Sequence, residues 1–442
     1  MRHFTLLTLQ LCVAVTVSAA NWSGWRGPEG TGVSLDENLP ETWGTNQNVR
    51  WRVPLPGPGN ASPIAWGSRV FIAQAIKSEK RRAVICFDRA DGRRLWQAGV
   101  IYGENEPTQE NNPYCSATPA TDGQRVVASF GSAGLYCYDM DGKERWHRDL
   151  SKMNHVWGNA SSPVLYGDYC ILNFGPDPKA RLIAVDSLDG HTRWEVQPPK
   201  VDPGEHPPAG GGTGGPGGVG EGPPGGTWST PLIVRTTQRD ELVMAFPGCL
   251  TGYEPLTGRQ LWLSRGIEGW VFTTPVWGDG AIVALSSGAL GGTILAVRPG
   301  GDGDVTGRGR VWRLDHLKSQ SIGSGVIHNG FLYLIAENGA ASCLELKTCD
   351  RVWEARLKGP GAKTSSWASM LLAGGRIYVP NQSGDVFVLR AGPRLELLAT
   401  NSVNEPTNAS LAASDGDLFL RTDRSLWCFA RDRGADQEPR RP

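Results

Sequence analysis

Hydrophobic and polar positions alternate along this chain in short runs that are separated by Gly and Asp-Gly turns. Residues 116–146, SATPATDGQRVVASFGSAGLYCYDMDGKERW, contain the clearest copy of the pattern. A small apolar strand comes first, two alternating strands follow, and a charged strand ends on Trp146. Four short strands of even spacing with turn chemistry between them are typical of one blade of a β-propeller.

The unit recurs along the chain, and the recurrence predicts the fold because a blade cannot bury its two faces without neighbours on both sides. Further copies cover residues 61–96, 161–194, 229–262, 273–312, 323–353 and 368–397, and a copy with three strands covers residues 409–429. The missing fourth strand is available at residues 48–55, where Trp51 stands in the repeat position. We therefore predict an all-β fold, an eight-bladed β-propeller of four-stranded antiparallel blades, closed by an N-terminal strand in the last blade.

Two columns of residues support this register. The third strand of each copy carries a small or compact residue, and these residues are Cys86, Cys137, Ala184, Gly252, Ala296, Cys343, Val388 and Cys428. The fourth strand carries Trp in six copies, at Trp96, Trp146, Trp194, Trp262, Trp312 and Trp353, where the seventh copy has Leu395 or Leu397. We interpret both columns as core packing, with each large ring docked between adjacent blades.

Composition and the chain ends define the remaining segments. Gly accounts for 58 of 442 residues, as many tight turns require. Basic residues (Lys and Arg) and acidic residues (Asp and Glu) number 44 each, and this charge balance argues against a nucleic-acid partner. Residues 1–20 have the basic start, apolar run and small-residue exit of a secretory signal peptide, with a retained N-terminal anchor as the alternative. Cleavage would leave no transmembrane span and an exported protein of the periplasm or cell envelope, which we expect to be a monomer.

The domain boundaries follow from the repeats. Residues 21–47 form an N-terminal extension, too irregular for a strand or a helix, which we expect to lie over one face of the ring. Residues 48–430 form the propeller, and residues 431–442 form a polar tail. Residues 198–226 are a Gly- and Pro-rich insertion that we expect to be disordered, because they contain too little apolar surface to offset the entropy of ordering.

The cysteines do not form a disulfide framework that can be read from their spacing. Eight remain after the signal segment with Cys12 is removed, and four of them stand in the small column of different blades. Buried free thiols are the expectation.

The residues that can carry function lie on the loops that enter the innermost strands, because propellers place ligand sites at the mouth of the central channel. These candidates are Asn60, Tyr114, Trp157, Asn159, Trp228, Trp270, Trp367 and Asn408, with His155 beside them. An aromatic rim interleaved with Asn can hold a peptide, a glycan or a flat cofactor; alternatively, these polar residues only satisfy backbone groups.

Two acidic segments are candidates for a metal or cofactor site. The loop at 101–114 carries Glu104, Glu106 and Glu110 and is expected to be a solvated acidic loop rather than part of the funnel. The GDGD run at 300–309 lacks the spacing of a calcium loop and is read as an Asp/Gly turn. The sequence has no HExxH, CxxCH or GxSxG motif, so catalytic residues remain unknown and no metal ligand is predicted.

The repeat, with its small-residue inner strand, Asp-Gly turn and outer Trp, resembles the quinoprotein-alcohol-dehydrogenase-like superfamily of eight-bladed propellers. The segments FGSAGLYCYDMDGKERW, HVWGNASSPVLYGDY, GDGDVTGRGRVW and LELLATNSV are similar to exported propellers with pyrroloquinoline-quinone-like repeats, a group similar to the propeller lipoprotein of the outer-membrane barrel-assembly machinery. Quinone-dependent members of the superfamily carry two adjacent cysteines and a Glu, Asn and Asp set that binds calcium. This chain has no adjacent cysteines.

Two functions follow from the resemblance. The first is a non-catalytic exported propeller that works without a cofactor and binds an envelope protein or another extended ligand through its funnel face. The second is an oxidoreductase that uses pyrroloquinoline quinone with calcium, held by Asn159, Asn60 or a loop carboxylate such as Glu106. The missing cysteine pair favours the first.

Overall fold

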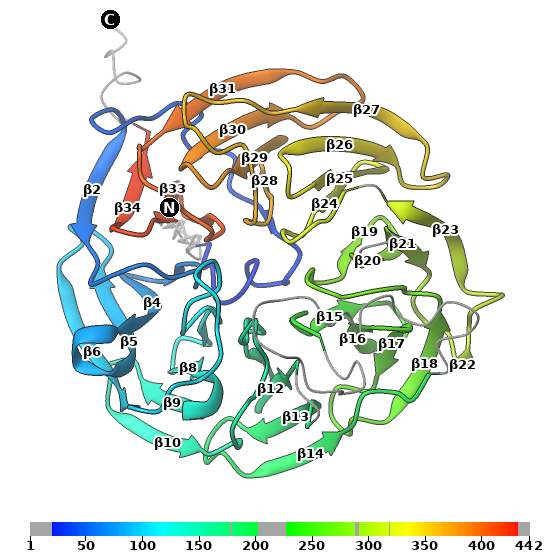
Figure 1. Ribbon diagram of the computed structural model, residues 1–442, viewed down its shortest axis with the longest axis horizontal. Helices are drawn as coiled ribbons and strands as arrows, with labels where there is room; N and C mark the ends of the chain where they lie inside the picture. Colours follow the sequence, from blue (N-terminus) through cyan, green and yellow to red (C-terminus); the bar gives the residue numbers. More distant parts are fainter. Residues whose placement is uncertain (1–19, 177–178, 202–226, 288–290, 318, 432–442) are drawn as a thin grey trace, which may run out of the picture.

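The computed structural model describes residues 20–176, 179–201, 227–287, 291–317 and 319–431. The expected signal segment at 1–19, residues 202–226 of the Gly/Pro insertion and residues 432–442 of the polar tail lie outside the described residues. The strands form eight sheets arranged around a centre like the blades of a propeller, as predicted (Figure 1). No helix among the described residues combines the length and apolar character needed to cross a bilayer.

Each blade has four antiparallel strands, numbered from the channel outward in blades 1 to 7. Blade 1 contains β3 (Ile64–Trp66), β4 (Arg69–Ile76), β5 (Arg81–Asp88) and β6 (Arg94–Ile101), and blade 2 contains β7 (Ala120–Thr121), β8 (Arg125–Ser129), β9 (Leu135–Asp139) and β10 (Glu144–Arg148). Blade 3 contains β11 (Val164–Tyr166), β12 (Tyr169–Phe174), β13 (Arg181–Asp186) and β14 (Thr192–Val196). Blade 4 contains β15 (Leu232–Arg235), β16 (Asp240–Phe246), β17 (Cys249–Tyr253) and β18 (Gln260–Arg265). Two short 3-10 helices, η1 (Lys77–Glu79) and η2 (Gly131–Ala133), interrupt blades 1 and 2.

Blades 5 to 7 repeat the pattern, and blade 8 completes the ring. Blade 5 contains β19 (Val276–Gly278), β20 (Ala281–Leu285), β21 (Gly292–Val297) and β23 (Arg310–Leu317), and blade 6 contains β24 (Val326–His328), β25 (Phe331–Ile335), β26 (Ala340–Glu345) and β27 (Arg351–Arg356). Blade 7 contains β28 (Leu371–Ala373), β29 (Arg376–Pro380), β30 (Asp385–Arg390) and β31 (Leu397–Ser402). Blade 8 contains β32 (Ala412–Ser414), β33 (Asp417–Arg421) and β34 (Ser425–Ala430). The outer strand of blade 8 is β2 (Val49–Pro54), which pairs antiparallel with β34, so the predicted N-terminal closure is confirmed.

The Trp column faces the small column directly across the two outer strands of each blade. The paired residues are Trp96 with Cys86, Trp146 with Cys137, Trp194 with Ala184, Trp262 with Gly252, Trp312 with Ala296, Trp353 with Cys343 and Trp51 with Cys428. In blade 7 the residue opposite Val388 is Ala399, so the expectation that Leu395 or Leu397 fills the Trp position is wrong. Leu395 precedes β31 and Leu397 pairs with Leu389. A bulge beside the small-column residue also occurs in other blades, so the difference lies in the turn between β30 and β31.

Six of these seven rings dock against the turn of the following blade. The indole N–H donates to a backbone carbonyl there, in the pairs Trp51–Arg89 at 2.7 Å, Trp96–Met140 at 2.8 Å, Trp146–Ser187 at 3.0 Å, Trp194–Pro255 at 3.0 Å, Trp312–Leu346 at 2.7 Å and Trp353–Gly392 at 3.1 Å. A Cβ on Gly92 would stand 2.7 Å from the ring of Trp51, and one on Gly142 would stand 2.6 Å from that of Trp96. The Asp-Gly turn and the Trp are therefore two halves of one contact between blades.

Trp262 is the exception, because an added strand takes the place of that turn. The segment at 300–309 forms β22 (Gly303–Asp304), which pairs parallel with β18 of blade 4. The indole N–H of Trp262 donates instead to Glu241 within its own blade, at 2.8 Å. Asp302 and Asp304 form ion pairs with Arg239 and Arg265.

A belt of hydroxyl groups joins the blades at the start of the inner strands. The backbone N–H of one blade donates to a Ser or Thr hydroxyl of the next, in the pairs Ser62–Thr118, Thr118–Ser162, Ser162–Thr230, Thr274–Ser324, Ser324–Ser369, Ser369–Ser410 and Ser410–Ser62, at 2.8–3.0 Å. We call these eight residues the hydroxyl belt. Among the described residues the link from Thr230 to Thr274 is not made, and the hydroxyl of Thr274 accepts from the indole of Trp25 instead.

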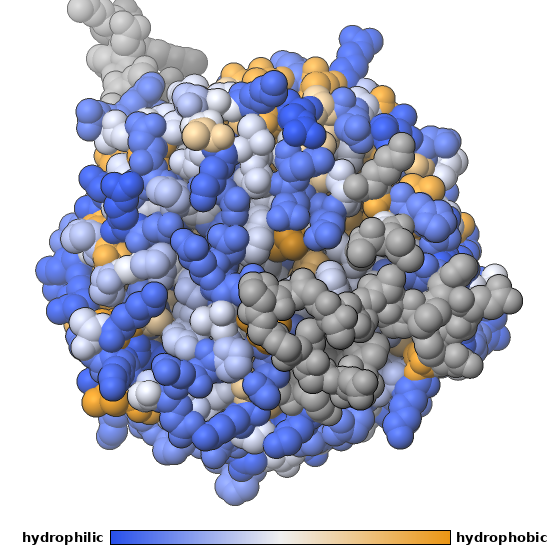
Figure 2. Space-filling model, in the orientation of Figure 1, coloured by the Kyte–Doolittle hydropathy of each residue, from blue (hydrophilic) through white to orange (hydrophobic). Residues whose placement is uncertain are grey.

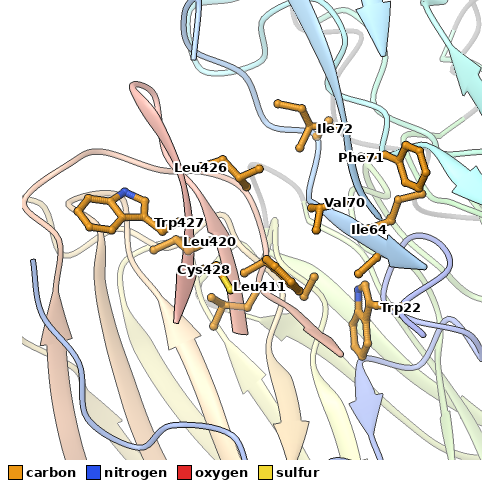
Figure 3. Packing of buried hydrophobic residues seen from close by; sticks show 14 of the residues in the cluster. Trp22, Ile64, Val70, Phe71, Ile72, Leu411, Leu420, Leu426, Trp427 and Cys428 are labelled. Atoms are coloured by element: carbon orange, nitrogen blue, oxygen red, sulfur yellow. The ribbon is translucent and has the colours of Figure 1, made fainter. Parts of the chain in front are cut away.

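The N-terminal extension crosses the mouth of the channel at the far ends of the inner strands. We call residues 21–43 the strap. Trp22 exchanges two backbone hydrogen bonds of 2.9 Å with Ala65 of β3, and Figure 3 shows its ring beside Ile64. Farther along, β1 (Val33–Ser34) adds to β28 as a parallel strand, so the expectation that this segment contains no strand is wrong.

Two buried side chains fasten the strap to the later blades. Arg26 is 3% exposed, and its guanidinium donates to the carbonyls of Ser324 and Gly325 in blade 6. The ring of Trp43 stacks on Tyr378 and Phe429, at centroid distances of 6.2 and 5.2 Å. One mouth of the channel is therefore occupied by the chain itself.

The core is made of layers between blades rather than one central cluster. The largest layer joins blades 7, 8, 1 and 2 and includes Trp22 and Trp427. All eight described cysteines are free thiols and seven of them are buried, as expected. On the face shown in Figure 2 hydrophilic residues predominate, and hydrophobic residues are scattered apart from a small group near the centre.

Candidate functional site

The predicted site residues all lie on the segments that lead into the inner strands. Asn60 precedes β3, Tyr114 precedes β7, Trp157 and Asn159 precede β11, Trp228 precedes β15, Trp270 precedes β19, Trp367 precedes β28 and Asn408 precedes β32. We call this mouth of the channel the rim. The strap contacts the opposite ends of the same strands, so the rim is the mouth that the strap does not cross.

Three of the predicted tryptophans come together on the rim. Trp157, Trp228 and Trp270, with Phe272 and His155, form a continuous group that we call the aromatic cluster. Trp157 meets Trp270 edge-on at 4.8 Å, and Trp228 lies 5.6 Å from Trp157 and 5.0 Å from Phe272. The imidazole of His155 stands edge-on to Trp228 at 5.0 Å. Trp228 is nearly buried, whereas Trp157, Trp270 and Phe272 are half-buried and so present part of their rings to solvent.

The backbone holds the aromatic cluster in place. Trp270 exchanges two backbone hydrogen bonds with Ser287, at 2.6 and 2.8 Å, and the indole N–H of Trp228 donates to the carbonyl of Gly158 at 3.0 Å. Because neighbouring blades 3, 4 and 5 supply the rings, their contact depends on blade order. Phe272 was missed by the sequence analysis; its place two residues after Trp270, at the entrance to an inner strand, was the available signal.

A second group on the rim is built from amides. The carbonyl of Asn111 accepts from the side chains of Asn60 and Asn408, at 2.8 and 3.3 Å. The side chain of Asn112 donates to the carbonyl of Trp157 at 2.6 Å, and that of Asn159 donates to Gly175 at 2.6 Å. The loop between blades 1 and 2 therefore reaches across the rim and connects blades 8, 1 and 3.

The same loop carries a buried ion pair, so the expectation of a solvated acidic loop is wrong for Glu106. A carboxylate oxygen of Glu106 lies 2.6 Å from the guanidinium of Arg82, and the two side chains are 7% and 4% exposed. The hydroxyl of Ser132 donates to the same carboxylate at 2.7 Å. The guanidinium of Arg82 also lies between the rings of Tyr102 and Tyr114, at 4.6 and 4.3 Å from their centroids.

Burial dominates the electrostatics of this group. Burial raises the pKa of the Tyr102 phenol, and the nearby carboxylates of Glu104 and Glu106 raise it further. Burial also raises the pKa of the Cys115 thiol, to about 12. A thiol with such a pKa stays protonated near neutral pH and is a poor nucleophile. The Cys115 thiol is therefore not a candidate nucleophile, and the side-chain amides beside it make hydrogen bonds.

Trp367 stands apart from the aromatic cluster. Its indole N–H donates to the carboxylate of Glu337 at 3.3 Å, and none of the ring contacts between described residues joins it to the cluster. Asn408 accepts from the side chain of Gln382 at 2.8 Å on this side of the rim. Three of the predicted residues thus form the aromatic cluster on blades 3 to 5, and Asn60, Trp367 and Asn408 lie on a polar side formed by blades 7, 8 and 1. Tyr114 and Asn159 lie between them, on blades 2 and 3.

A small cavity lies beside three of the candidate residues. Glu106, Tyr114 and Asn159 line a cavity of about 20 Å³, which has room for one or two water molecules. Within the described ranges no three His, Cys, Asp or Glu side chains are grouped so that they can hold a metal ion. The carboxylate of Glu106 is already engaged by Arg82.

A family model described as outer membrane protein assembly factor BamB matches the chain at residues 44–156, 80–268 and 248–436. No curated protein matches it. Among solved structures, BamB from Moraxella catarrhalis is 14% identical with a TM-score of 0.58, covering 86% of this chain and 97% of that one. Quinohemoprotein alcohol dehydrogenase from Comamonas testosteroni is 11% identical with a TM-score of 0.66, covering 94% of this chain and 81% of that one. A europium-containing methanol dehydrogenase is 12% identical with a TM-score of 0.63, covering 93% of this chain and 98% of that one. At these identities the structural likeness shows the fold alone.

Proposed function

Because the chain belongs to the family described as outer membrane protein assembly factor BamB, we propose that it is a non-catalytic scaffold that binds a segment of an envelope protein through the rim. The aromatic cluster is the observation that carries this proposal. Half-buried Trp and Phe rings in mutual contact offer a rigid apolar surface beside polar groups. Trp is enriched among the residues that dominate the energy of protein interfaces.

The geometry of the cluster suits binding with little loss of entropy. The backbone of Trp270 is fixed by two hydrogen bonds, and the rings of Trp157 and Trp228 fix one another. Side chains that are already ordered lose little further freedom when a partner binds. The amides of the polar side of the rim can then hydrogen-bond the backbone of an extended segment that crosses from blades 3 to 5 toward blades 7 and 8.

The proposed location is the periplasm or cell envelope. Two observations support it: the secretory pattern of residues 1–20 and membership of a family described by an outer-membrane assembly factor. Equal numbers of acidic and basic residues leave no net charge to attach the protein to an anionic surface.

The quinone alternative fits the residues less well. A quinone and calcium need carboxylate and amide oxygens that converge on a cavity large enough for a flat three-ring molecule. Here Asn159 and Glu106 face a cavity of about 20 Å³, and the carboxylate of Glu106 lies 2.6 Å from Arg82. Titration of the protein with pyrroloquinoline quinone and calcium tests this directly; a stoichiometric coloured complex that reduces a dye when alcohol is added would overturn the scaffold proposal.

Affinity capture from native envelope extract tests the scaffold proposal. We expect Trp157→Ala and Trp270→Ala to reduce the recovery of the captured protein by about tenfold, since each removes a ring from the contact surface. The control is Trp353→Ala, which removes a ring docked between outer strands. It is expected to lower the melting temperature and to leave capture unchanged below melting. If Trp157→Ala unfolds the protein while Trp270→Ala captures normally, the rings are core and the rim does not bind.

A further inference from the structure

A second cavity lies at the opposite mouth, between the strap and the inner strands of blades 2 to 4. Its volume is about 360 Å³, within the range of ligand sites. The half-buried rings of Trp25 and Trp66 line it together with Pro163, Leu165, Pro231 and Ile233. The rim and the proposed function make no use of this cavity.

The polar side chains of the cavity are already engaged with one another or with the backbone. Glu29 forms an ion pair with Arg235 at 2.7 Å, and Asp122 pairs with Arg125 at 3.0 Å. The hydroxyl of Thr274 accepts from the indole of Trp25. A ligand would therefore contact apolar side chains and the backbone rather than unpaired charged side chains.

The backbone at this place is a row of strand edges. The sheets of a propeller are arranged radially, so each inner strand presents its edge to the channel, and an edge carries N–H and C=O groups that can pair with another chain. The strap pairs with such edges in three blades. Ala65 pairs with Trp22, the N–H of Thr121 donates to Ser23, and the N–H of Leu372 donates to Gly32 beside β1.

The corresponding edges of blades 3 and 4 line the cavity. Leu165 is the middle residue of the three-residue strand β11 and pairs with Cys170, as Ala65 is the middle residue of β3 and pairs with Val70. Ile233 lies on β15. Among the described residues, the strap makes no hydrogen bond with either Leu165 or Ile233. The molecule thus contains strand edges of one type, some paired by its own strap and some left open on a cavity.

We propose that this cavity binds an extended segment of a partner protein as an added strand on the edges of β11 and β15. Main-chain hydrogen bonds to Leu165 and Ile233 would hold the segment, and an apolar side chain would fill the space beside Trp25 and Trp66. Strands β11 and β15 are three and four residues long, so the partner segment that pairs with them is short, about three to five residues. The parallel pairing of β1 with β28 is the example that the chain itself supplies.

The probe is a synthetic peptide with the sequence of residues 31–36, TGVSLD, labelled with fluorescein, because its Val33–Ser34 pair already adds to an inner edge. Fluorescence anisotropy with the full chain is expected to show saturable binding. Residue-resolved amide exchange is expected to slow at Leu165 and Ile233 when the peptide is bound, because added-strand pairing protects those N–H groups.

A matched pair of variants tests where the peptide sits. A Cβ on Gly24 meets only Ala120, at 3.7 Å, and one on Gly44 meets nothing within 4 Å, so both positions tolerate a side chain. Gly24 lines the cavity and Gly44 does not. We expect Gly24→Leu, which fills the cavity, to weaken peptide binding by about tenfold or more, and Gly44→Leu to leave it unchanged.

Three results would overturn the proposal. One is the absence of saturable binding to the wild-type chain. Another is equal binding by wild type and Gly24→Leu when both fold. The third is a change in amide exchange at Leu372 rather than at Leu165 and Ile233, since that pattern means that the peptide displaces the strap from β28. Loss of capture by the rim variants with normal peptide binding, or the reverse, separates this proposal from the proposed function.

Discussion

The hydroxyl belt makes a quantitative prediction about how the ring is held together. Thr118 is fully buried, and its hydroxyl accepts the backbone N–H of Ser62 from the neighbouring blade at 2.9 Å. Thr118→Val keeps the shape of the side chain and removes the acceptor. The N–H of Ser62 is then left buried without a partner, which costs about 1–3 kcal/mol.

Urea unfolding followed by tryptophan fluorescence measures this cost. We expect the transition of Thr118→Val to move to lower urea with an unchanged slope, and the free energy of unfolding to fall by about 1–3 kcal/mol. The amide of Ser62 is expected to exchange faster with solvent. The control is Thr45→Val, an exposed position in the extension, which is expected to change the free energy by less than about 0.5 kcal/mol. A variant as stable as wild type, with unchanged exchange at Ser62, would refute the belt as a source of stability.

Three further predictions concern the closure, the buried ion pair and the thiols. Trp51→Ala removes the ring whose indole donates to the carbonyl of Arg89, so the free energy of unfolding should fall by about 3–5 kcal/mol. Limited proteolysis should then cut the variant first near residues 48–55, and resistance to proteolysis equal to wild type would contradict the role of β2 as the closing strand. Glu106→Gln leaves the guanidinium of Arg82 buried without its anion and should cost about 3–5 kcal/mol by the same urea assay, with unaltered stability as the contrary result. Burial raises the pKa of the Cys115 thiol to about 12, above the value of about 8.5 expected in the unfolded chain. Between these two pH values the folded state keeps a proton that the unfolded state releases, so the free energy of unfolding should fall as pH rises from about 8.5 toward 12. Cys115→Ala should therefore lose stability less steeply over that window in unfolding curves at pH 7, 9 and 10, and equal slopes for both proteins would contradict the assignment.

The two mouths of the channel differ because the chain crosses only one of them. The strap pairs through its backbone with the inner strands of blades 1, 2 and 7, and the buried side chains of Arg26 and Trp43 contact blades 6, 7 and 8. The rim is bridged by the loop that carries Asn111 and Asn112. The proposed rim site and the strap-side cavity therefore lie at different mouths of the channel.

The repeats were predictable from the sequence because each blade is built by local rules. Strand alternation, Asp-Gly turns and the Trp and small columns recur at regular spacing, and the pairing of Trp96 with Cys86 follows from one hairpin. The closure by β2 was also predictable, since the last copy lacked a strand that Trp51 could supply. Counting failed in blade 7, where Ala399 lies opposite Val388 because the turn between β30 and β31 differs from that of the other blades.

The rim could be predicted as a set of loops but not as a set of contacts. The sequence placed Trp157, Trp228 and Trp270 before inner strands, and the order of the blades brought them together. Trp367 carries the same signal and stands apart. Nothing local indicates that Glu106 folds back onto Arg82, because that contact depends on the path of a long loop.

The sequence by itself determined the number of blades, the register within every blade except blade 7 and the segment that closes the ring, because these depend on a hydrogen-bonding period that the copies repeat. Only the tertiary structure decided the route of the strap, the grouping of the rim residues and the strand edges left open on the cavity. Those features arise from segments without periodicity, whose position is selected by the surfaces that remain after the eight blades have closed.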